Sequence, residues 1–261
     1  MSYEDGLFKE VFGKLKEYSN DKEKYINEVA NKVVLLVIER RKSKKEEIDN
    51  EKIKSILKYT RWLLKQLYDD YVSRSQSKNS IIEDIEYIGS GYKSIALRVG
   101  DNVLKLGKHD YKYTGKQLDT KYQIPTYIKD RYEIGEKIYL EVQVAPYVDI
   151  KNITLENVYE TYSNIRDLGY IWNDPKEDNM GRIINVGGCK IGDKTYLPKH
   201  QYNKGDIVIL DLEDIAYVGE ETSDLILDEI SMMSYNRNVY NFETRKMEEK
   251  SQQKIMRKSW A

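Results

Sequence analysis

The segment 174–179 (DPKEDN) holds three polar residues whose types and spacing suit phosphoryl transfer. Asp174 is followed by Lys176 two positions later and by Asn179 five positions later. A carboxylate can orient an attacking hydroxyl, a lysine can balance charge on the transferring phosphoryl group, and an asparagine can hold Mg²⁺. These residue types make Asp174 and Lys176 candidate catalytic residues and Asn179 a candidate metal ligand, although the pattern taken alone also arises by chance in sequences rich in Lys and Asn.

A second magnesium ligand is predicted where the apolar run 207–210 ends. Asp211 follows that run directly. A carboxylate at the end of a buried strand is well placed to bind Mg²⁺, a hard cation that takes carboxylate and phosphate oxygens. Glu213 and Asp214 follow closely and are alternative ligands, and a carboxylate that only ends a strand at a turn is the plain structural interpretation.

Upstream, a glycine-rich turn and a lysine in a strand have the residue types that bind nucleotide phosphates. The segment 89–94 (GSGYKS) separates two β-type runs, and Lys105 lies in the third such run, within VLKL. Glycines let backbone amides approach phosphates closely, and a lysine on a nearby strand can contact them. Taken singly, the turn is typical of an ordinary hairpin, and the lysine is typical of an outward-facing position on an edge strand.

Together these features follow the order found in protein kinases: glycine loop, strand lysine, Asp-x-Lys-x-x-Asn and strand-terminal Asp. The chain resembles the protein-kinase-like superfamily over about residues 81–220. The resemblance implies ATP and Mg²⁺ as cofactors and a bilobal α+β fold, with an antiparallel β N-lobe and a reduced helical C-lobe. It implies that the nucleotide is bound by Gly89, Ser90, Gly91, Tyr92, Lys93, Ser94, Ala96 and Lys105.

Several positions depart from the kinase pattern. Ser94 replaces the third glycine of the loop, and Trp172 and Asn173 stand where the family has His-Arg. No amphipathic helix follows Lys105 to supply the glutamate that the family pairs with this lysine. The candidate carboxylates are Asp119, Glu133 and Glu136. We expect the N-terminal helices to provide the missing support from outside the lobe.

The second lobe is predicted to be small. Only 25 positions separate Asp149 from Asp174, which leaves room for one helix, and no Ala-Pro-Glu follows Asp211. Such economy resembles minimal bacterial kinases that lack activation-loop control. Lys176 favours a Ser/Thr protein kinase, because aminoglycoside phosphotransferases share the Asp and Asn but typically lack that lysine. The alternatives are a pseudokinase that binds a nucleotide or a partner, and a small-molecule kinase of the aminoglycoside phosphotransferase type.

Hydrophobic periodicity predicts the elements that must position these residues. Apolar residues at helical spacing indicate two helices within 1–80 and one helix over 155–168. The runs that indicate strands are 81–88, 94–99, 103–107 and 136–144, the first three as an antiparallel set. Residues 108–130 are interpreted as a loop. We therefore expect an N-terminal helical domain (1–80), a kinase-like N-lobe (81–148) and a reduced C-lobe (149–261).

Composition limits the partners and the compartment. The 261 residues include 43 basic and 44 acidic ones, and residues 81–239 carry 19 basic against 27 acidic, which argues against a nucleic-acid-binding face. A single cysteine, Cys189, excludes a disulfide framework and fits a reducing compartment. The longest aliphatic run, 33–38, is too short to span a bilayer. We expect a cytoplasmic protein, with leaderless export also compatible, that acts on a protein substrate and has room for a partner protein at its N-terminal helices.

Overall fold

The computed structural model describes residues 10–18, 20–39, 48–75, 81–90, 94–109, 118–172, 174–212 and 215–217. Within them, helices and antiparallel strands form an α+β fold, as the sequence predicts. The elements are η1 (Leu15–Tyr18), α2 (Lys22–Glu39), α3 (Asn50–Ser75), α4 (Ile81–Asp84), β1 (Ile85–Ser90), β2 (Ser94–Val99), β3 (Asn102–His109), β4 (Ile128–Gly135), β5 (Ile138–Pro146), β6 (Val148–Asp149), α5 (Leu155–Asp167), β7 (Tyr170–Trp172), η2 (Glu177–Asn179), β8 (Met180–Ile183), β9 (Cys189–Ile191), β10 (Lys194–Tyr196), β11 (Ile207–Ile209) and β12 (Ile215–Tyr217). Among these helices, none is both long and apolar enough to cross a membrane.

The chain divides into two compact units that alternate along the sequence. The first, called here the helix–sheet unit, comprises Met1–Tyr113, Pro125–Tyr147 and Asn185–Lys199. The second unit comprises Thr114–Ile124, Val148–Ile184 and His200–Ala261. Helices α2 and α3 thus belong to the same unit as the five-stranded sheet, and the chain enters each unit more than once.

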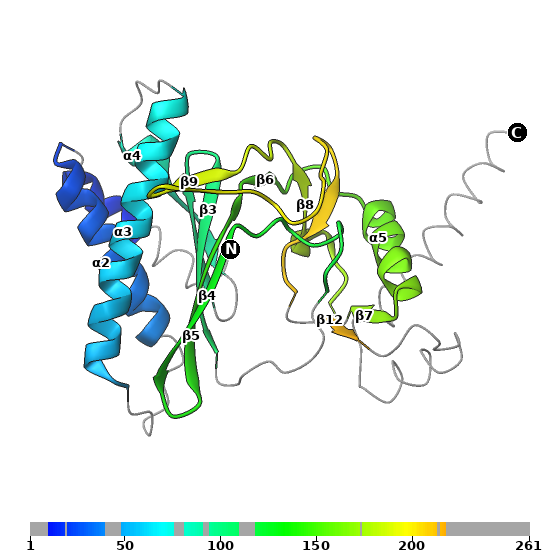
Figure 1. Cartoon of the computed structure of the whole chain (residues 1–261), viewed down its shortest axis with the longest axis horizontal. Helices are drawn as coiled ribbons and strands as arrows, with labels where there is room; N and C mark the ends of the chain where they lie inside the picture. The colour runs from blue at the N-terminus through cyan, green and yellow to red at the C-terminus, as the bar shows by residue number, and fades with distance from the viewer. Residues whose placement is uncertain are drawn as a thin grey trace, which may run out of the picture. The chain divides into compact units, whose positions relative to one another are not determined.

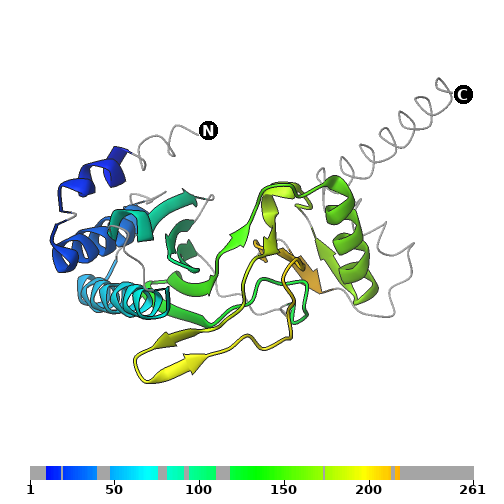
Figure 2. The same ribbon diagram turned by 90° about the horizontal axis from the view of Figure 1, so that it is seen from above.

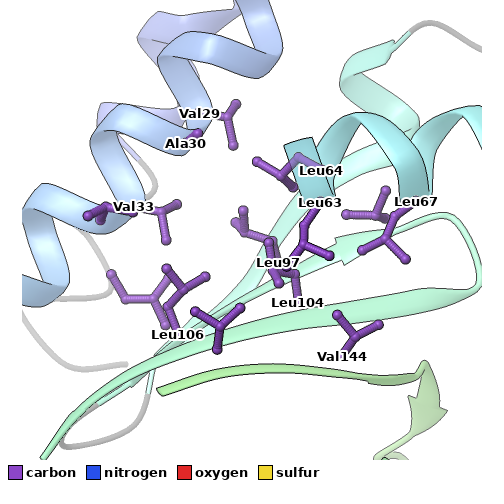
Figure 3. Packing of buried hydrophobic residues seen from close by; sticks show 14 of the residues in the cluster. Val29, Ala30, Val33, Leu63, Leu64, Leu67, Leu97, Leu104, Leu106 and Val144 are labelled. Atoms are coloured by element: carbon purple, nitrogen blue, oxygen red, sulfur yellow. The ribbon is translucent and has the colours of Figure 1, made fainter. Parts of the chain in front are cut away.

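Helices α2 and α3 pack on one face of the five-stranded sheet (Figure 1). In both helices the buried residues recur every three or four positions, which places them on one side of the helix. In Figure 3 they meet side chains from alternate positions of the strands. The residues labelled in this core are Val29, Ala30, Val33, Leu63, Leu64, Leu67, Leu97, Leu104, Leu106 and Val144. The N-terminal helices therefore share one core with the sheet.

Strands β1 to β5 form an antiparallel sheet in the order β1-β2-β3-β5-β4. The first three strands confirm the antiparallel set that the sequence predicts, but the expected strand over 81–88 is wrong at its start, because Ile81–Asp84 form the short helix α4 and β1 runs over Ile85–Ser90. Because side chains alternate between the two faces of a strand, the buried Ile95, Leu97 and Val99 of β2 point to one face and Ala96 to the other. Lys105 of β3 lies directly opposite Ala96. We call the face that holds Ala96 and Lys105, away from the helices, the Lys105 face.

Strand β4 lies within the region that the sequence leaves without regular structure. The expectation of a loop over 108–130 is wrong at both ends, because β3 continues to His109 and β4 begins at Ile128. β4 is an edge strand, and its centre (KDRYE, 129–133) is almost entirely charged. Charges on an edge strand discourage pairing with another sheet, and here they also remove the apolar alternation by which strands are recognised.

The second unit is built from α5 and several short strands. The sequence predicts a helix over 155–168, and α5 confirms it at Leu155–Asp167. The helix begins with a capping box in which the side chains of Thr154 and Asn157 each accept a hydrogen bond from the other residue's backbone N–H. Its buried Val158 and Ile165 pack in one cluster with Trp172. This cluster is the core on which the strands of the second unit rest.

A hairpin between β8 and β11 belongs to the helix–sheet unit although both flanking strands belong to the second. Its strands β9 and β10 pair antiparallel, and β9 lies against α3 (Figure 2). The Lys190 N–H donates to Asp70 Oδ2 at 3.2 Å, and the Gly192 N–H donates to Gln66 Oε1 at 3.0 Å. Two side chains of α3 thus anchor the backbone of this hairpin.

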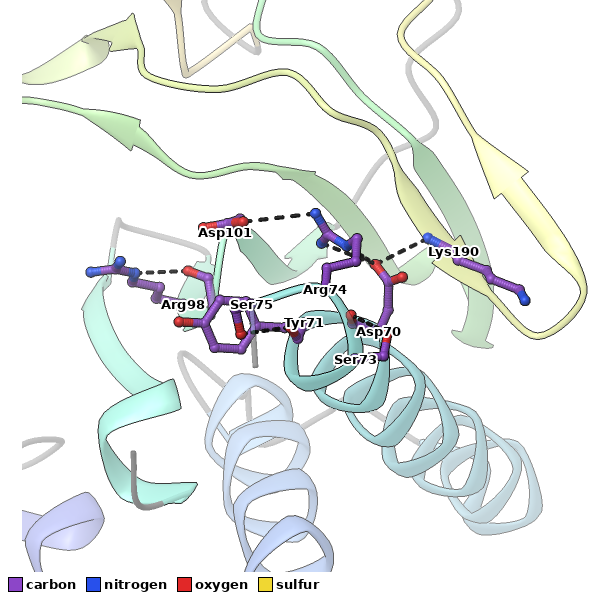
Figure 4. A network of polar contacts seen from close by, with 9 residues as sticks. Asp70, Tyr71, Ser73, Arg74, Ser75, Arg98, Asp101 and Lys190 are labelled. Atoms are coloured by element: carbon purple, nitrogen blue, oxygen red, sulfur yellow. Dashed lines mark hydrogen bonds and ion pairs between the residues drawn. The ribbon is translucent and has the colours of Figure 1, made fainter. Parts of the chain in front are cut away.

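A polar network at the C-terminal end of α3 extends these contacts (Figure 4). The Arg74 guanidinium pairs with Asp70 at 3.0 Å and with Asp101 at 3.8 Å. The Asp101 carbonyl in turn accepts a hydrogen bond from the Tyr147 N–H at 2.7 Å. The end of α3 therefore links the hairpin, the β2–β3 turn and the segment that follows β5.

Gly100 in the β2–β3 turn packs directly against Tyr71 of α3. Its φ is +57°, and a Cβ atom at this position would lie 2.1 Å from the Tyr71 ring. We expect Gly100→Ala to lower the free energy of unfolding by about 1–3 kcal/mol, measured by denaturant titration, because the ring must move and the backbone is strained. Gly13→Ala, at a helical position with open space around it, is the control and is expected to leave stability unchanged or raised. Equal effects of the two substitutions would contradict this packing.

Cys189 in β9 reports on the docking of the hairpin. Its side chain is buried, and burial together with the nearby Asp70 raises the pKa of the thiol to about 12. We expect iodoacetamide to modify this single cysteine at neutral pH only after unfolding, because the thiolate is the reactive form. Mass spectrometry of the chain labelled in buffer and in denaturant checks this, and rapid labelling in buffer would contradict the docked hairpin.

The same raised pKa has a consequence for stability at alkaline pH. The pKa of a cysteine thiol in an unfolded chain is about 8.5, whereas the folded thiol stays neutral until the pH is far higher. The contribution of Cys189 to stability is therefore complete below about pH 8.5 and is lost progressively as the pH rises toward the folded pKa.

Candidate active site

Strand pairing in the second unit brings Asn179 and Asp211 together. β8 pairs antiparallel with β11, with Met180 opposite Ile209. Just beyond this pair, the Leu210 N–H donates to the Asn179 carbonyl at 2.8 Å. Asp211 is the next residue, so the backbones that carry the two predicted metal ligands run side by side.

A second strand pair adds the segment that carries Asp174. β7 pairs antiparallel with β12, with Trp172 opposite Ile215. Asp174 follows β7 by two residues, and Asp211 precedes β12 by four. The pairing therefore holds the start of the Asp174 segment beside the stretch between β11 and β12. Asp174, Asn179 and Asp211 consequently occupy one region of the second unit, whereas Asn173, Glu213 and Asp214 lie outside the described residues.

Hydrogen bonds fix the geometry of the 174–179 segment. The Asn179 side-chain NH₂ donates to Asp174 Oδ2 at 2.8 Å and to the Asp174 carbonyl at 2.9 Å. The Lys176 ammonium forms an ion pair with the same Asp174 oxygen. The short helix η2 turns the chain so that residues five positions apart can meet. The residues that share this spacing therefore form a closed loop, which is held together by the Asp174 carboxylate.

This loop leaves three groups suited to binding a cation or an acceptor. The NH₂ end of Asn179 is used toward Asp174, so its amide oxygen is the atom that remains for a metal ion. The side chains of Asp174 and Lys176 are 22% and 47% exposed, so both are open to solvent and to a substrate. The loop therefore presents a partly exposed carboxylate, an ammonium group and an amide oxygen within a few residues.

Trp172 supports the loop by packing into the core of the second unit. Its side chain is completely buried and lies in the same cluster as Met180, Ile209 and Ile215. Its indole Nε1 finds no hydrogen-bond partner in the described part of the chain. The position that holds histidine in the kinase pattern is thus an apolar anchor here, and the loop rests on dispersion contacts rather than on a polar histidine.

The predicted nucleotide-binding residues belong to the helix–sheet unit. Gly89 and Ser90 end β1, Ser94 begins β2, and Gly91, Tyr92 and Lys93 between them lie outside the described residues. A Cβ atom at Gly89 would meet no other atom within 4 Å. Ala96 and Lys105 are cross-strand neighbours on the Lys105 face. The structure therefore places the described ones among these residues on one sheet, while Asp174, Lys176, Asn179 and Asp211 are in the second unit.

The three carboxylates proposed as partners of Lys105 have other surroundings. Asp119 belongs to the second unit and pairs with His200 at 2.7 Å. Glu133 is exposed on the edge strand β4, two strands from β3, and Glu136 is exposed between β4 and β5. Among the described residues, Lys105 itself forms no recorded ion pair with any of them.

A charged cluster on the Lys105 face of the sheet was not predicted from the sequence. Arg131 of β4 donates from Nη2 to Glu141 Oε2 of β5 at 2.6 Å and from Nε to the same oxygen at 3.2 Å. Lys129 Nζ lies 3.8 Å from Glu141 Oε1. The signal was the period-two alternation of Lys129, Arg131 and Glu133, which places three charged residues on one face once the segment is recognised as a strand.

A magnesium site here would need nucleotide oxygens to be complete. No group of three or more His, Cys, Asp and Glu side chains converges as a metal site within the described residues. Mg²⁺ in phosphoryl-transfer sites is usually held by one or two carboxylates together with substrate phosphates and water. One carboxylate from Asp211 and one amide oxygen from Asn179 fit that donor set.

Comparison with protein-family models and with curated protein sequences gives no relative from which a function can be transferred. The chain matches no protein-family model and no curated protein sequence. The functional assignment must therefore rest on the residues and geometry of this chain.

Proposed function

We propose that this protein is an ATP- and Mg²⁺-dependent phosphotransferase of the protein-kinase-like bilobal fold, and specifically a minimal Ser/Thr protein kinase without activation-loop control. The observation that carries the proposal is the closed loop in which Asn179 and Lys176 both contact the Asp174 carboxylate, with Asp211 joined to it through the β8–β11 pair. These are the residue types that phosphoryl transfer requires, and two strand pairs bring them together from segments 32 positions apart.

Each residue of the loop has a distinct role in the proposed reaction. The Asp174 carboxylate accepts a hydrogen bond from the acceptor hydroxyl and takes its proton as the oxygen attacks. The Lys176 ammonium stabilises negative charge on the phosphoryl group that moves. Asn179 and Asp211 hold Mg²⁺, which together with ATP supplies the reactive phosphoryl group. Most of the rate enhancement then comes from positioning and from charge stabilisation by groups already in place.

The position of Lys105 supports the nucleotide assignment. Protein kinases carry the lysine that contacts ATP phosphates on the third strand, and Lys105 lies in the middle of β3. Its neighbour across the strand pair, Ala96, is small, and Ala145 lies in register with Val103 on the same face. Small and aliphatic side chains leave room for a planar base, and the described residues of the glycine-rich segment, Gly89, Ser90 and Ser94, lie at the adjoining ends of β1 and β2.

A reducing, ATP-rich compartment suits this activity. The single cysteine is buried as a neutral thiol, and no disulfide is available to stabilise the fold. We therefore place the protein in the cytoplasm with a protein substrate, and Lys176 is the residue that favours a protein acceptor over an aminoglycoside-type one.

A pseudokinase is the second candidate, and one observation favours it. The αC glutamate has no counterpart among the three carboxylates that the sequence offers, so Lys105 lacks its expected partner in the described residues. In a pseudokinase the fold would bind a nucleotide or display α2 and α3 to a partner without catalysing transfer.

Nucleotide binding separates the proposal from a protein that uses the fold only as a scaffold. We expect Mg²⁺-ATP to raise the midpoint temperature of unfolding, because a ligand that binds only the folded state stabilises it. Asp211→Asn is expected to abolish the Mg²⁺-dependent part of that shift, whereas Asp193→Asn, an exposed carboxylate in the β9–β10 turn, should retain it. No shift for the wild-type chain at millimolar ATP would contradict the proposal.

A further inference from the structure

In two adjacent rows of the Lys105 face, cations outnumber carboxylates. Lys105 of β3 is opposite Gln143 of β5, which is opposite Lys129 of β4. In the next row, Gly107 is opposite Glu141, which is opposite Arg131. Two lysines and an arginine therefore surround one glutamate within two adjacent rows of the sheet.

Glu141 is the carboxylate nearest to Lys105 on this face by strand register. Its position on β5 is diagonal to Lys105 on the neighbouring strand, a distance that long side chains span. Glu86 on β1 is opposite Arg98, so it is two strands away, and Glu133 on β4 is also two strands away. Glu141 is thus the acidic side chain of the described sheet that Lys105 reaches most easily.

The contacts of Glu141 leave one of its oxygens available. Both nitrogens of Arg131 bind the same atom, Oε2, at 2.6 and 3.2 Å. Oε1 has Lys129 Nζ at 3.8 Å, which is beyond hydrogen-bond distance. The Glu141 side chain is only 13% exposed, so its position is fixed by the sheet and by Arg131. Oε1 is therefore the carboxylate oxygen of Glu141 that accepts no hydrogen bond among the described residues.

An acceptor is needed to orient the Lys105 side chain, because a lysine is less preorganised than an arginine. Its ammonium is a point charge on a flexible stem with three rotatable donors, and a partner must hold it in one direction before it can serve a phosphate. In the described residues no ion pair or hydrogen bond is recorded for it. Its neighbours Ala96 across the strand pair and Gly107 along β3 are small.

We propose that Glu141 is the positioning residue of Lys105, taking from within the sheet the part that a helix glutamate has in the kinase pattern. This inference rests on the proposed function and explains how a lobe without that helix can direct its lysine. When the nucleotide is bound, the Lys105 ammonium turns to Glu141 Oε1, a contact that the structure itself does not hold, while Arg131 keeps Oε2. The remaining donors of Lys105 then face the phosphates of the nucleotide. Arg131 thereby holds the Glu141 carboxylate in the position from which it orients Lys105.

The test compares transfer kinetics of three single variants with the wild-type full-length chain. Glu141→Gln is expected to lower kcat/KM for ATP by about 100-fold, because a misplaced group costs about that much, with the loss in KM as well as in kcat. Glu86→Gln, an exposed carboxylate on the same face, is the matched control and should keep wild-type kinetics. Arg131→Gln should lose less than Glu141→Gln, because Oε1 remains present.

A double variant shows whether the effect passes through the lysine. In a Lys105→Met background, Glu141→Gln is expected to cause no further loss, whereas independent roles would multiply the two losses. Unfolding midpoints of all variants identify any loss that reflects a damaged fold. Wild-type kinetics for Glu141→Gln, or multiplicative losses in the double variant, would overturn the assignment while leaving the proposed function intact. A wild-type chain that neither binds nor hydrolyses nor transfers from Mg²⁺-ATP would overturn the proposed function itself.

Discussion

Replacing Asp174 by alanine is expected to slow phosphate transfer to an acceptor hydroxyl by about 10²–10⁴-fold, the range that a positioned general base contributes. The physical reason lies in the closed loop, where the carboxylate is the shared partner of Lys176 and Asn179. Its removal takes away the proton acceptor and also releases both neighbours. The measurement is the initial rate of transfer from labelled ATP to a generic protein acceptor at saturating Mg²⁺.

The chain offers a matched control for this substitution in the same loop. Asp178 is an exposed carboxylate four residues after Asp174, with no recorded contact, so Asp178→Ala should retain wild-type rates. Asp174→Asn adds a finer comparison, because it keeps the size of the side chain and removes its basicity. Equal rates for Asp174→Ala and Asp178→Ala would show that Asp174 is not the base, whatever the total activity.

Replacing Leu64 by alanine is expected to lower the free energy of unfolding by about 2–5 kcal/mol, the usual cost of a large cavity in a packed core. Leu64 is completely buried in α3, within the core that α2, α3 and the sheet share (Figure 3). The rigid sheet on one side and α2 on the other leave the site little freedom to collapse. Denaturant unfolding followed by circular dichroism measures the change.

The same variant tests whether the helices stabilise the sheet or only extend from it. Because one core holds both, the signals from helix and strand should be lost in a single transition at a lower denaturant concentration. Lys58→Ala, at an exposed position of the same helix, should leave the midpoint unchanged. A variant in which helix signal is lost first while the sheet stays folded would contradict the shared core.

Features that depend on short stretches of sequence could be predicted. The buried stripes of α2 and α3 repeat every three to four residues, and the helix 155–168 carries its own cap at Thr154. The five-residue spacing singled out Asp174 and Asn179, and the structure joins these two residues by a hydrogen bond across a single turn. Local periodicity and local geometry determine these features, so reading along the chain recovers them.

Features that depend on distant pairing could not be predicted. β4 lacks apolar alternation because it is a charged edge strand, and it becomes recognisable only beside β5. The docking of the β9–β10 hairpin on α3 joins residues more than a hundred positions apart, through Lys190 and Asp70. The diagonal position of Glu141 on β5 relative to Lys105 on β3 follows from the register of these two strands. None of these is encoded in a short window of sequence.

Transfer of the labelled γ-phosphate of ATP by the purified full-length chain tests the central proposal most directly. We expect incorporation of label into the chain itself or into a generic Ser/Thr acceptor protein, dependent on Mg²⁺ and abolished by chelation. Asp174→Ala should reduce it to background while Asp178→Ala does not. Mg²⁺-ATP binding without any transfer, in wild type and Asp174→Ala alike, would contradict an enzyme and leave the pseudokinase as the function of this fold.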